Sequence, residues 1–411
     1  MRRILFEDAG FQDLLPLTYF RPVWELRSGV WSNRERFKQL FPDEKLLLYA
    51  RSYLMKYSLL PETVTDLTDN ADSLFLNGRW LPDQKSRKII DDLPLNSALV
   101  SGAEILALRQ KDKNLNYYFQ EGLIITDRVL NDFRQITTED EPIHFLWDLI
   151  DRNGSQIIMD FERAMVGGKF VGKVDDGCHL MSRENIFVDQ GARVMPGVVI
   201  NAEDGPVWMD KGSRTMPNSV LEGPVYIGAN SLIKIGAKIY ENTSIGKTCK
   251  VGGEVEESII QEYSNKQHDG FLGHSYLGAW INIGADTNNS DLKNNYGEIS
   301  VYLNNRTIST GKRFMGTIMG DHTKTSINTQ LNTGTVIGVN CNIFGEGFPP
   351  KFIPSFSWGG ASGFNSYDFE KSVQVAKTVM ERRNVPFTDR ERNLFQAVKD
   401  LSGRVEKIAQ K

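Results

Sequence analysis

The sequence predicts three parts: an α/β domain at the N-terminus, a left-handed parallel β-helix of hexapeptide repeats, and a C-terminal tail that is mostly helical. Apolar or small residues recur every six positions from Val188 onward, residues 1–150 lack this period, and helical spacing returns near the C-terminus. A chain of 411 residues has room for two or three domains. We therefore place the α/β domain at 1–165, the β-helix at 180–348 and the tail at 349–411.

The six-residue period is the strongest signal in the sequence. Its longest series comprises Met209, Thr215, Leu221, Ile227, Ile233, Ile239, Ile245 and Val251. Two shorter series are Val188, Val194 and Ile200, and Met319, Thr325, Leu331, Ile337 and Ile343. This period fits neither a helix nor simple strand alternation and is typical of a hexapeptide β-helix, whose coils turn one residue per flat face inward. A β-sandwich with glycine-rich turns is the alternative, but a long series in one register argues against it.

The register of the repeat breaks at 252–270 and again at 286–316. Insertions in a solenoid leave the coil as loops, usually on a functional face. The second break is long for a loop without structure of its own, so we expect it to serve a function.

The flanking segments have other patterns. Short apolar runs at 46–50, 73–78 and 98–109 alternate with helical or loop segments, which favours a small α/β domain. Beyond the repeat, near-helical spacing predicts helices at 367–382 and 389–409.

Composition excludes several classes of protein. Lys and Arg number 48 against 52 Asp and Glu, so the chain lacks the charge of a general nucleic-acid binder. We expect no membrane span and no signal peptide, because no apolar run is long enough and the N-terminus has no cleavage site. The three cysteines, Cys178, Cys249 and Cys341, are too sparse for a disulfide framework, which favours the cytoplasm.

One stretch of the repeat region carries a recognisable motif. Residues 254–287, EVEESIIQEYSNKQHDGFLGHSYLGAWINIGADT, place His268 fourteen residues before Asn282. This stretch resembles, without gaps, the acetyltransferase motif of the bifunctional bacterial N-acetylglucosamine-1-phosphate uridyltransferase/glucosamine-1-phosphate acetyltransferase family. NNYG at 294–297 resembles a later motif of that family. The chain is similar to a variant branch with a short N-terminal domain, and the resemblance implies a homotrimer.

The resemblance implies that His268 and Asn282 are catalytic, with acetyl-CoA as acyl donor and an amino-sugar phosphate as acceptor. An imidazole with a pKa of about 6.5 suits removal of a proton from an attacking amine. The alternative for His268 is an exposed loop histidine. We expect His274 and His322 to be structural.

The resemblance also implies substrate-binding residues around this pair. Asn295 and Tyr296 would give neutral hydrogen bonds to the sugar. Lys266, Lys250 or Lys293 would place a cation near its phosphate. Phe271 stands where the family has a sugar-binding tyrosine, and Glu256 where it has a phosphate-binding lysine.

The N-terminal segment AGFQDLLPLTYFRP, at 9–22, resembles the phosphate loop of sugar nucleotidyltransferases, with Thr18 at a matching position. Gln12 replaces a glycine of that loop. Arg21 and Arg27 follow closely, and we expect their guanidinium groups to clamp the phosphates of a nucleoside triphosphate.

The strand end FLNGRWLP, at 75–82, resembles the site whose aspartate holds Mg²⁺ in that family, but Arg79 stands at the aspartate position. Mg²⁺ is therefore implied only if the domain is active. Its ligands stay unassigned, and Asp13 and Asp160 are the acidic residues considered as ligands.

Three functions remain open. The first is a transferase of amino-sugar nucleotide synthesis, with acyl transfer on the β-helix and nucleotidyl transfer to a sugar 1-phosphate by the N-domain. The second is a sugar-1-phosphate nucleotidyltransferase whose β-helix is structural. The third is a non-catalytic sugar-nucleotide-binding protein.

Overall fold

The structure is a computed structural model, and it describes all residues except 59, 61, 65–66, 68–70, 112–113 and 407–411. The chain divides into two compact units. Unit 1 comprises Met1–Leu26, Trp31–Phe145 and Thr388–Ala397, and unit 2 comprises Arg27–Val30, Leu146–Phe387 and the rest of the C-terminus. Among the described residues, no helix is both long and apolar enough to cross a bilayer.

Unit 1 is built on a mixed six-stranded sheet, as the α/β prediction requires. The strand order is β2-β1-β3-β5-β4-β8, in which β5 is antiparallel to both of its neighbours. The strands are β1 (Arg2–Phe6), β2 (Leu46–Tyr49), β3 (Ser73–Asn77), β4 (Ser97–Ser101), β5 (Glu104–Gln110), β8 (Arg134–Thr137) and a small hairpin of β6 (Phe119–Gln120) and β7 (Leu123–Ile124). The helices are η1 (Ala9–Leu14), η2 (Val23–Glu25), α1 (Asn33–Leu40), α2 (Ser52–Tyr57), α3 (Gln84–Asp91), η3 (Leu115–Tyr117) and α4 (Thr126–Asp132).

The strand order fixes where a ligand of unit 1 would bind. Strand β1 pairs in parallel with β2 on one side and with β3 on the other, so the chain changes direction at β1. In open α/β sheets, ligands bind outside the carboxyl ends of the strands at such a switch point. Asp8 and Arg79 follow the ends of β1 and β3 and therefore lie at this position.

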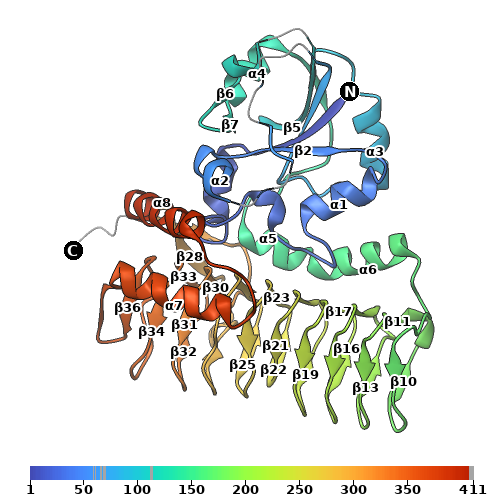
Figure 1. The fold of residues 1–411 in the computed structure, drawn as a ribbon, viewed down its shortest axis with the longest axis vertical. Coiled ribbons are helices and arrows are strands. Elements are labelled where there is room, and N and C mark those ends of the chain that lie inside the picture. The colour runs from blue at the N-terminus through green and yellow to red at the C-terminus, as the bar shows by residue number, and fades with distance from the viewer. Residues whose placement is uncertain (59, 61, 65–66, 68–70, 112–113, 407–411) are drawn as a thin grey trace. The chain divides into compact units, whose positions relative to one another are not determined.

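Unit 2 is a parallel β-helix with three faces, which confirms the predicted fold class (Figure 1). The first face contains β10 (His179–Met181), β13 (Val199–Asn201), β16 (Val220–Glu222), β19 (Lys238–Ile239), β22 (Glu254–Glu256) and β25 (Phe271–Gly273), with β27 (Asn288–Asn289) and β32 (Gln330–Leu331) as a separate pair. The second face contains β11 (Ile186–Val188), β14 (Val207–Met209), β17 (Val225–Ile227), β20 (Thr243–Ile245), β23 (Ile259–Ile260), β26 (Tyr276–Leu277), β30 (Thr317–Met319), β33 (Thr335–Ile337) and β35 (Phe352–Ile353). The third face contains β9 (Lys173–Val174), β12 (Arg193–Val194), β15 (Arg214–Thr215), β18 (Leu232–Ile233), β21 (Lys250–Val251), β24 (Asn265–Lys266) and, beyond single bridges through Asn282, β31 (Lys324–Thr325), β34 (Asn342–Ile343), β36 (Ser357–Gly360) and β37 (Gly363–Ser366).

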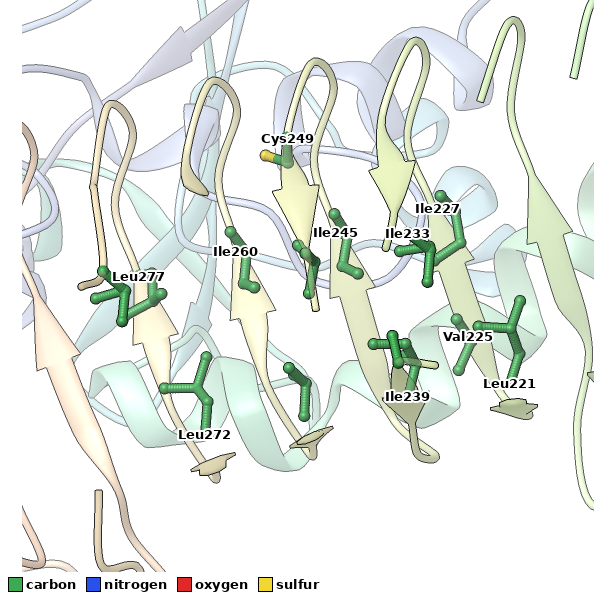
Figure 2. Close-up of a cluster of buried hydrophobic side chains, with 14 of the residues drawn as sticks. Leu221, Val225, Ile227, Ile233, Ile239, Ile245, Cys249, Ile260, Leu272 and Leu277 are labelled. Carbon is green, nitrogen blue, oxygen red and sulfur yellow. The ribbon is translucent and has the colours of Figure 1, made fainter. Parts of the chain in front are cut away.

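The residues at six-residue spacing form the interior of the coils, as predicted. Figure 2 shows Leu221, Ile227, Ile233, Ile239 and Ile245 directed into the space between the three faces. Each of these side chains is at most 1% exposed. Burying one such side chain stabilises the fold by about 1.5–3 kcal/mol, so the series supplies a continuous hydrophobic core.

Polar residues with left-handed backbone conformations form many of the corners. Asparagine is the residue type other than glycine that adopts this conformation most readily, because its short side chain bonds locally. The asparagines with positive φ at corners of the β-helix are Asn218, Asn230, Asn242, Asn328 and Asn340.

The first register break is not a loop, which corrects the expectation for 252–270. The strands on either side stay paired throughout this interval. The interior positions are Val251, Val255, Ile260, Lys266 and Leu272, so two corners are shorter by one or two residues while the coil continues. The six-residue search loses its register here because corner length changes, and because one interior position holds a lysine.

The second register break is an excursion from the coil, as predicted. Strand β27 lies in the first face, and the chain then leaves it to form an antiparallel hairpin of β28 (Ser300–Leu303) and β29 (Arg306–Ser309). The coil resumes with β30 on the second face.

The ladder extends beyond the predicted limits of the β-helix at both ends. Strand β9 starts at Lys173, and β35 and β36 continue the second and third faces after residue 348. The remaining helices are α5 (Leu146–Asp151), α6 (Asn153–Ala164), η4 (Arg183–Asn185), α7 (Phe369–Glu381) and α8 (Asp389–Val405). Helix α6 lies along the second face of the coil, as Figure 1 shows, so the segment up to Ala164 packs with the β-helix.

Candidate functional site

His268 lies at the corner between the third and first faces. Strand β24 ends two residues before it, and β25 begins three residues after it. The side chain is exposed, and among the described residues its ring has no hydrogen-bond partner. An exposed imidazole with free ring nitrogens is available to accept a proton from a bound amine.

Lys266 holds this corner from inside the coil. Its side chain is 2% exposed, and Nζ donates to the carbonyl oxygens of Gly252 at 2.9 Å, His268 at 3.1 Å and Gly270 at 2.6 Å. Burial lowers the pKa of Lys266 to about 8. The expected role as a phosphate ligand does not fit this geometry, because the ammonium group already has three acceptors and faces inward.

A cationic cavity of about 410 Å³ opens on the third face. Four of its lining residues carry positive charge, namely Lys250, Lys324, Arg382 and Arg383. Among the described residues that line it, none is a carboxylate. Burial lowers the pKa of Lys324 to about 8, and its Nζ donates to the carbonyl of His322 at 2.8 Å. The charge and size of this cavity suit a ligand that carries phosphate groups.

Asn282 lines the same cavity, beside two aromatic rings. Tyr263 and Trp280 stack on one another at a centroid distance of 4.2 Å and an angle of 3°. Asn282 is exposed and bridges Asn265 on the preceding coil to Lys324 on the next. The amide and the rings offer hydrogen bonding and stacking at the edge of a positive site.

Outward side chains continue this positive charge along the third face. The register aligns them in one column: Lys173, Arg193, Arg214, Leu232, Lys250, Asn265, Asn282 and Lys324. Asp175 pairs with the first two of them, so the unbalanced charge lies nearer the cavity.

The end of helix α7 completes the cavity. Arg383 donates to Asn265 Oδ1 at 2.9 Å. Met380 packs with Ala279 and Trp280, which anchors the helix over this corner. Sequence analysis missed Arg382 and Arg383, because nothing in a helical pattern of the tail says which coil it covers.

A second cavity, of about 280 Å³, opens on the first face. Glu254, Asp269 and Phe271 line it, together with Lys238 and Asn288. Glu254 is paired with Lys238 at 3.0 Å, and Asn288 Oδ1 accepts from the backbone of Phe271 at 2.8 Å. The carboxylate of Asp269 gives this cavity an unbalanced negative charge.

The residues before and after His268 in the corner line different cavities. Gln267 lines the cationic cavity, whereas Asp269 and Gly270 line the second. The structure therefore places Asn282 and Phe271 in different cavities, on either side of the predicted base.

Asn295 and Tyr296 lie elsewhere, in the excursion. Asn295 Oδ1 accepts from the backbone of Gly297 at 3.1 Å, and Tyr296 is 67% exposed with a φ of 55°. Neither lines the two cavities around His268. The family motif predicted that these two residues bind the sugar, but in this structure they lie in the excursion and not at the corner with His268.

The predicted phosphate clamp of the N-terminal segment is not assembled. Thr18 is buried and donates to the carbonyl of Phe11 at 3.0 Å. Arg27 belongs to unit 2, where its guanidinium donates to the carbonyl of Val30 and lies over the ring of Tyr226. Arg21 lies in unit 1, and its carbonyl accepts from Arg51 at 2.9 Å.

Arg79 fills the switch point of the N-terminal sheet. It is 3% exposed and donates to Asp8 at 2.6 Å and 2.8 Å, to Glu104 at 2.6 Å and to the carbonyl of Ile143 at 2.7 Å. Burial lowers the pKa of Arg79, but Asp8 and Glu104 outweigh this effect and hold it above its ordinary value. A Cβ atom on Gly10 would lie 2.3 Å from the guanidinium carbon, so the loop closes directly on this side chain.

These residues do not fit a Mg²⁺ ion. A guanidinium stands where a carboxylate ligand is needed, and it neutralises Asp8, the acidic residue at the end of β1. Of the two acidic residues considered for a metal, Asp160 is buried in α6 and accepts from the backbone of Val30 at 2.9 Å, and Asp13 lies in η1.

Comparison with known proteins identifies the class of the N-terminal part. Residues 3–167 match the sugar nucleotidyl transferase family, so this part of the chain is a domain of that class.

Curated relatives combine two activities in their names. The chain is 32% identical over 117 residues to a bifunctional sugar-1-phosphate nucleotidylyltransferase/acetyltransferase of Sulfurisphaera tokodaii, a match that covers 28% of each chain. It is 28% identical over 139 residues to the bifunctional protein GlmU of Methanocaldococcus jannaschii, covering 34% of this chain and 29% of that protein. The match to GlmU of Prochlorococcus marinus is 25% identical over 243 residues and covers 58% of this chain and 42% of the relative. The chain thus spans less than half the length of these relatives.

Among solved structures, a UDP-N-acetylglucosamine acyltransferase from Campylobacter jejuni is similar at a TM-score of 0.34 and 12% identity, covering 58% of this chain and 85% of that one. A likeness at this level supports no conclusion about activity.

Proposed function

We propose that the protein is an acyltransferase that moves an acetyl group from acetyl-CoA to the amine of an amino-sugar phosphate, with His268 as general base. The observation that carries this proposal is that the neighbours of His268 line two different cavities, Gln267 a cationic one and Asp269 an acidic one, while His268 itself is exposed at the corner that joins them in sequence. Transfer of an acetyl group from acetyl-CoA to an amine brings an anionic, phosphate-bearing donor and a basic acceptor together beside one proton acceptor.

The cationic cavity is suited to the donor. Acetyl-CoA carries several phosphate groups and an adenine ring, and this cavity offers four positive side chains beside stacked aromatic rings. Guanidinium and ammonium groups in a partly enclosed site bind phosphate more strongly than they do in open water.

The second cavity is suited to the acceptor. An amino sugar carries an ammonium group at neutral pH, and Asp269 supplies a carboxylate that attracts it. His268 first removes a proton from the ammonium group, and the neutral amine then attacks the thioester carbon. The tetrahedral intermediate expels CoA as a thiolate, which takes up the second N–H proton directly or from solvent. Exposed backbone N–H groups of the corner would stabilise the oxyanion.

The N-terminal domain supports a second candidate function, the binding of a sugar nucleotide without nucleotidyl transfer. The Asp8–Arg79 ion pair at the switch point favours this function over Mg²⁺-dependent catalysis.

The test of the main proposal uses His268→Ala and a matched control, His179→Ala, which removes another exposed histidine of the β-helix. CoA release is measured with acetyl-CoA and glucosamine 1-phosphate. We expect His268→Ala to lose about 10²–10⁴-fold in kcat, with partial recovery at high pH where the amine is already neutral.

The free energy of unfolding should change by less than about 1 kcal/mol, because the ring is exposed. Near wild-type turnover of His268→Ala at pH 7 would show that the base lies elsewhere. A variant that unfolds would assign His268 a structural role.

A further inference from the structure

Three metal-binding side chains converge at a corner between the first and second faces. Glu256, His274 and Asp291 each offer one ligand atom, and these atoms lie within 4.8 Å of one another. Within the described residues, this is the group of three that could hold an ion. None of these residues lines the two cavities beside His268.

Each residue comes from a different part of the coil path. Glu256 ends β22, and His274 follows β25 on the next coil. Asp291 lies two residues after β27, at the start of the excursion. Three segments that are distant in sequence therefore bring one donor each to the same point.

The spacing of the donors suits one ion. His274 Nδ1 and Asp291 Oδ2 form a hydrogen bond of 2.8 Å, which an ion bound to both atoms would replace. Two neighbouring ligands at about 2.0–2.2 Å from an ion lie roughly 3 Å apart, so this pair already has the separation of adjacent ligands. The Glu256 carboxylate lies within 4.8 Å of both atoms.

The charge of the cluster calls for a cation. Glu256 is partly buried, and its carboxylate has no hydrogen-bond partner in the described part of the chain. Two carboxylates and one imidazole retain a net negative charge even when the imidazole is protonated.

The excursion closes at this cluster. The backbone of Met315 donates to the carbonyl of Asp291 at 2.8 Å, and Gly316 donates to that of His274 at 2.9 Å. Phe314 stacks on the His274 ring at 4.9 Å, which shields one side of the site. An ion here would join both ends of the excursion to the coil.

We propose that Glu256, His274 and Asp291 bind one divalent transition-metal ion, which ties the ends of the 286–316 excursion to the β-helix. One imidazole with two carboxylates is a donor set for Zn²⁺, Mn²⁺ or Co²⁺ rather than for Ca²⁺, which takes oxygen ligands alone. This site is independent of the proposed acyl transfer.

The experiment titrates the full-length protein, after treatment with a chelator, with Zn²⁺ and Mn²⁺ in a calorimeter and with Co²⁺ in an absorption spectrometer. The variants are Glu256→Gln and Asp291→Asn, and the matched control is Glu257→Gln, whose carboxylate instead accepts from Asn242 at 2.7 Å. All proteins carry Cys178→Ser, which removes the thiol that is not buried.

We expect one ion per chain, visible Co²⁺ absorption bands and a higher Tm with metal. Affinity should fall at least about tenfold in Glu256→Gln and Asp291→Asn and stay unchanged in Glu257→Gln. Two results would overturn the proposal. One is that none of the three ions binds at about 1 mM, a concentration on the order of the dissociation constants of the weakest protein metal sites. The other is equal affinity in all variants. If Asp291→Asn fails to fold by circular dichroism, Glu256→Gln, which keeps its size, decides the outcome.

Discussion

Lys266 occupies a place in the coil that the six-residue series otherwise fills with apolar side chains. The register pairs it with Val251, an interior residue of the preceding coil. Residue type alone pointed to a phosphate ligand, because lysine is rarely buried. Its three carbonyl acceptors belong to the segment that carries His268, so it acts as a positioning residue for that corner.

The burial of Lys266 predicts how stability depends on pH. Its pKa is about 8 in the folded chain and about 10.5 in the unfolded chain, so between these values only the unfolded chain holds the proton. Stability therefore rises with pH in this window, and the contribution is flat below it. In Lys266→Met this rise is lost.

The measurement is urea unfolding from pH 6 to 10. The free energy of unfolding of the wild type, minus that of Lys266→Met, should rise by up to about 1.4 kcal/mol per pH unit above pH 8. Lys211→Met, at an exposed corner, is the control. A difference that falls with pH would contradict the buried ammonium.

Arg79 is a second residue whose place could not be read from the sequence. The motif showed that an arginine replaces an aspartate, but not that Asp8 and Glu104 would both reach it. Arg79→Ala removes the cation that balances the buried Asp8 carboxylate, whose remaining partners, the backbone of Gly10 and the amide of Asn77, are neutral. We expect a loss of about 3–5 kcal/mol in the stability of the protein. Arg87→Ala removes a half-exposed arginine as a control, and we expect a change of less than about 0.5 kcal/mol. Equal unfolding curves for the two variants would show that the Arg79 ion pairs contribute little.

At the scale of elements, the end of helix α7 adds positive charge to the third face of the β-helix. Arg382 and Arg383, at its end, supply half of the positive charges that line the cationic cavity. We expect Arg382→Ala with Arg383→Ala to raise KM for acetyl-CoA about tenfold or more with little change in kcat, because these groups bind the donor in both ground and transition states.

The control is Lys377→Ala, which removes an exposed charge from the same helix. Steady-state kinetics at two salt concentrations provide the measurement, since the wild type should lose donor affinity with added salt. An unchanged KM in the double variant would move the donor site away from this cavity.

The elements themselves were largely predictable. The helices near 369–381 and 389–405 and the interior of the coils followed from spacing alone. The prediction of a loop at 252–270 was wrong, because a fixed six-residue period cannot represent corners of unequal length. Most of the candidate site could not be predicted from the sequence either. Arg383 and Asn265, for example, form a hydrogen bond although they are 118 residues apart in the chain.

At the scale of the whole molecule, we predict a homotrimer. The faces of the β-helix are flat, and Ile235 and Ile327, at its corners between the third and first faces, are 63% and 67% exposed. Apolar side chains at repeated corners favour association between copies of the chain. Light scattering at micromolar concentration should give about three times the mass of one chain, and a monomeric mass would contradict this prediction.

The shortened corners at 252–270 have a consequence for how such a protein changes over generations. The gain or loss of one codon at a corner reshapes the groove beside His268 and leaves every strand paired. The same change within a strand would turn an apolar side chain toward water. We therefore expect insertions and deletions to cost less stability at the corners than within the strands. A change of corner length can thus alter the surface around His268 while the interior stays the same.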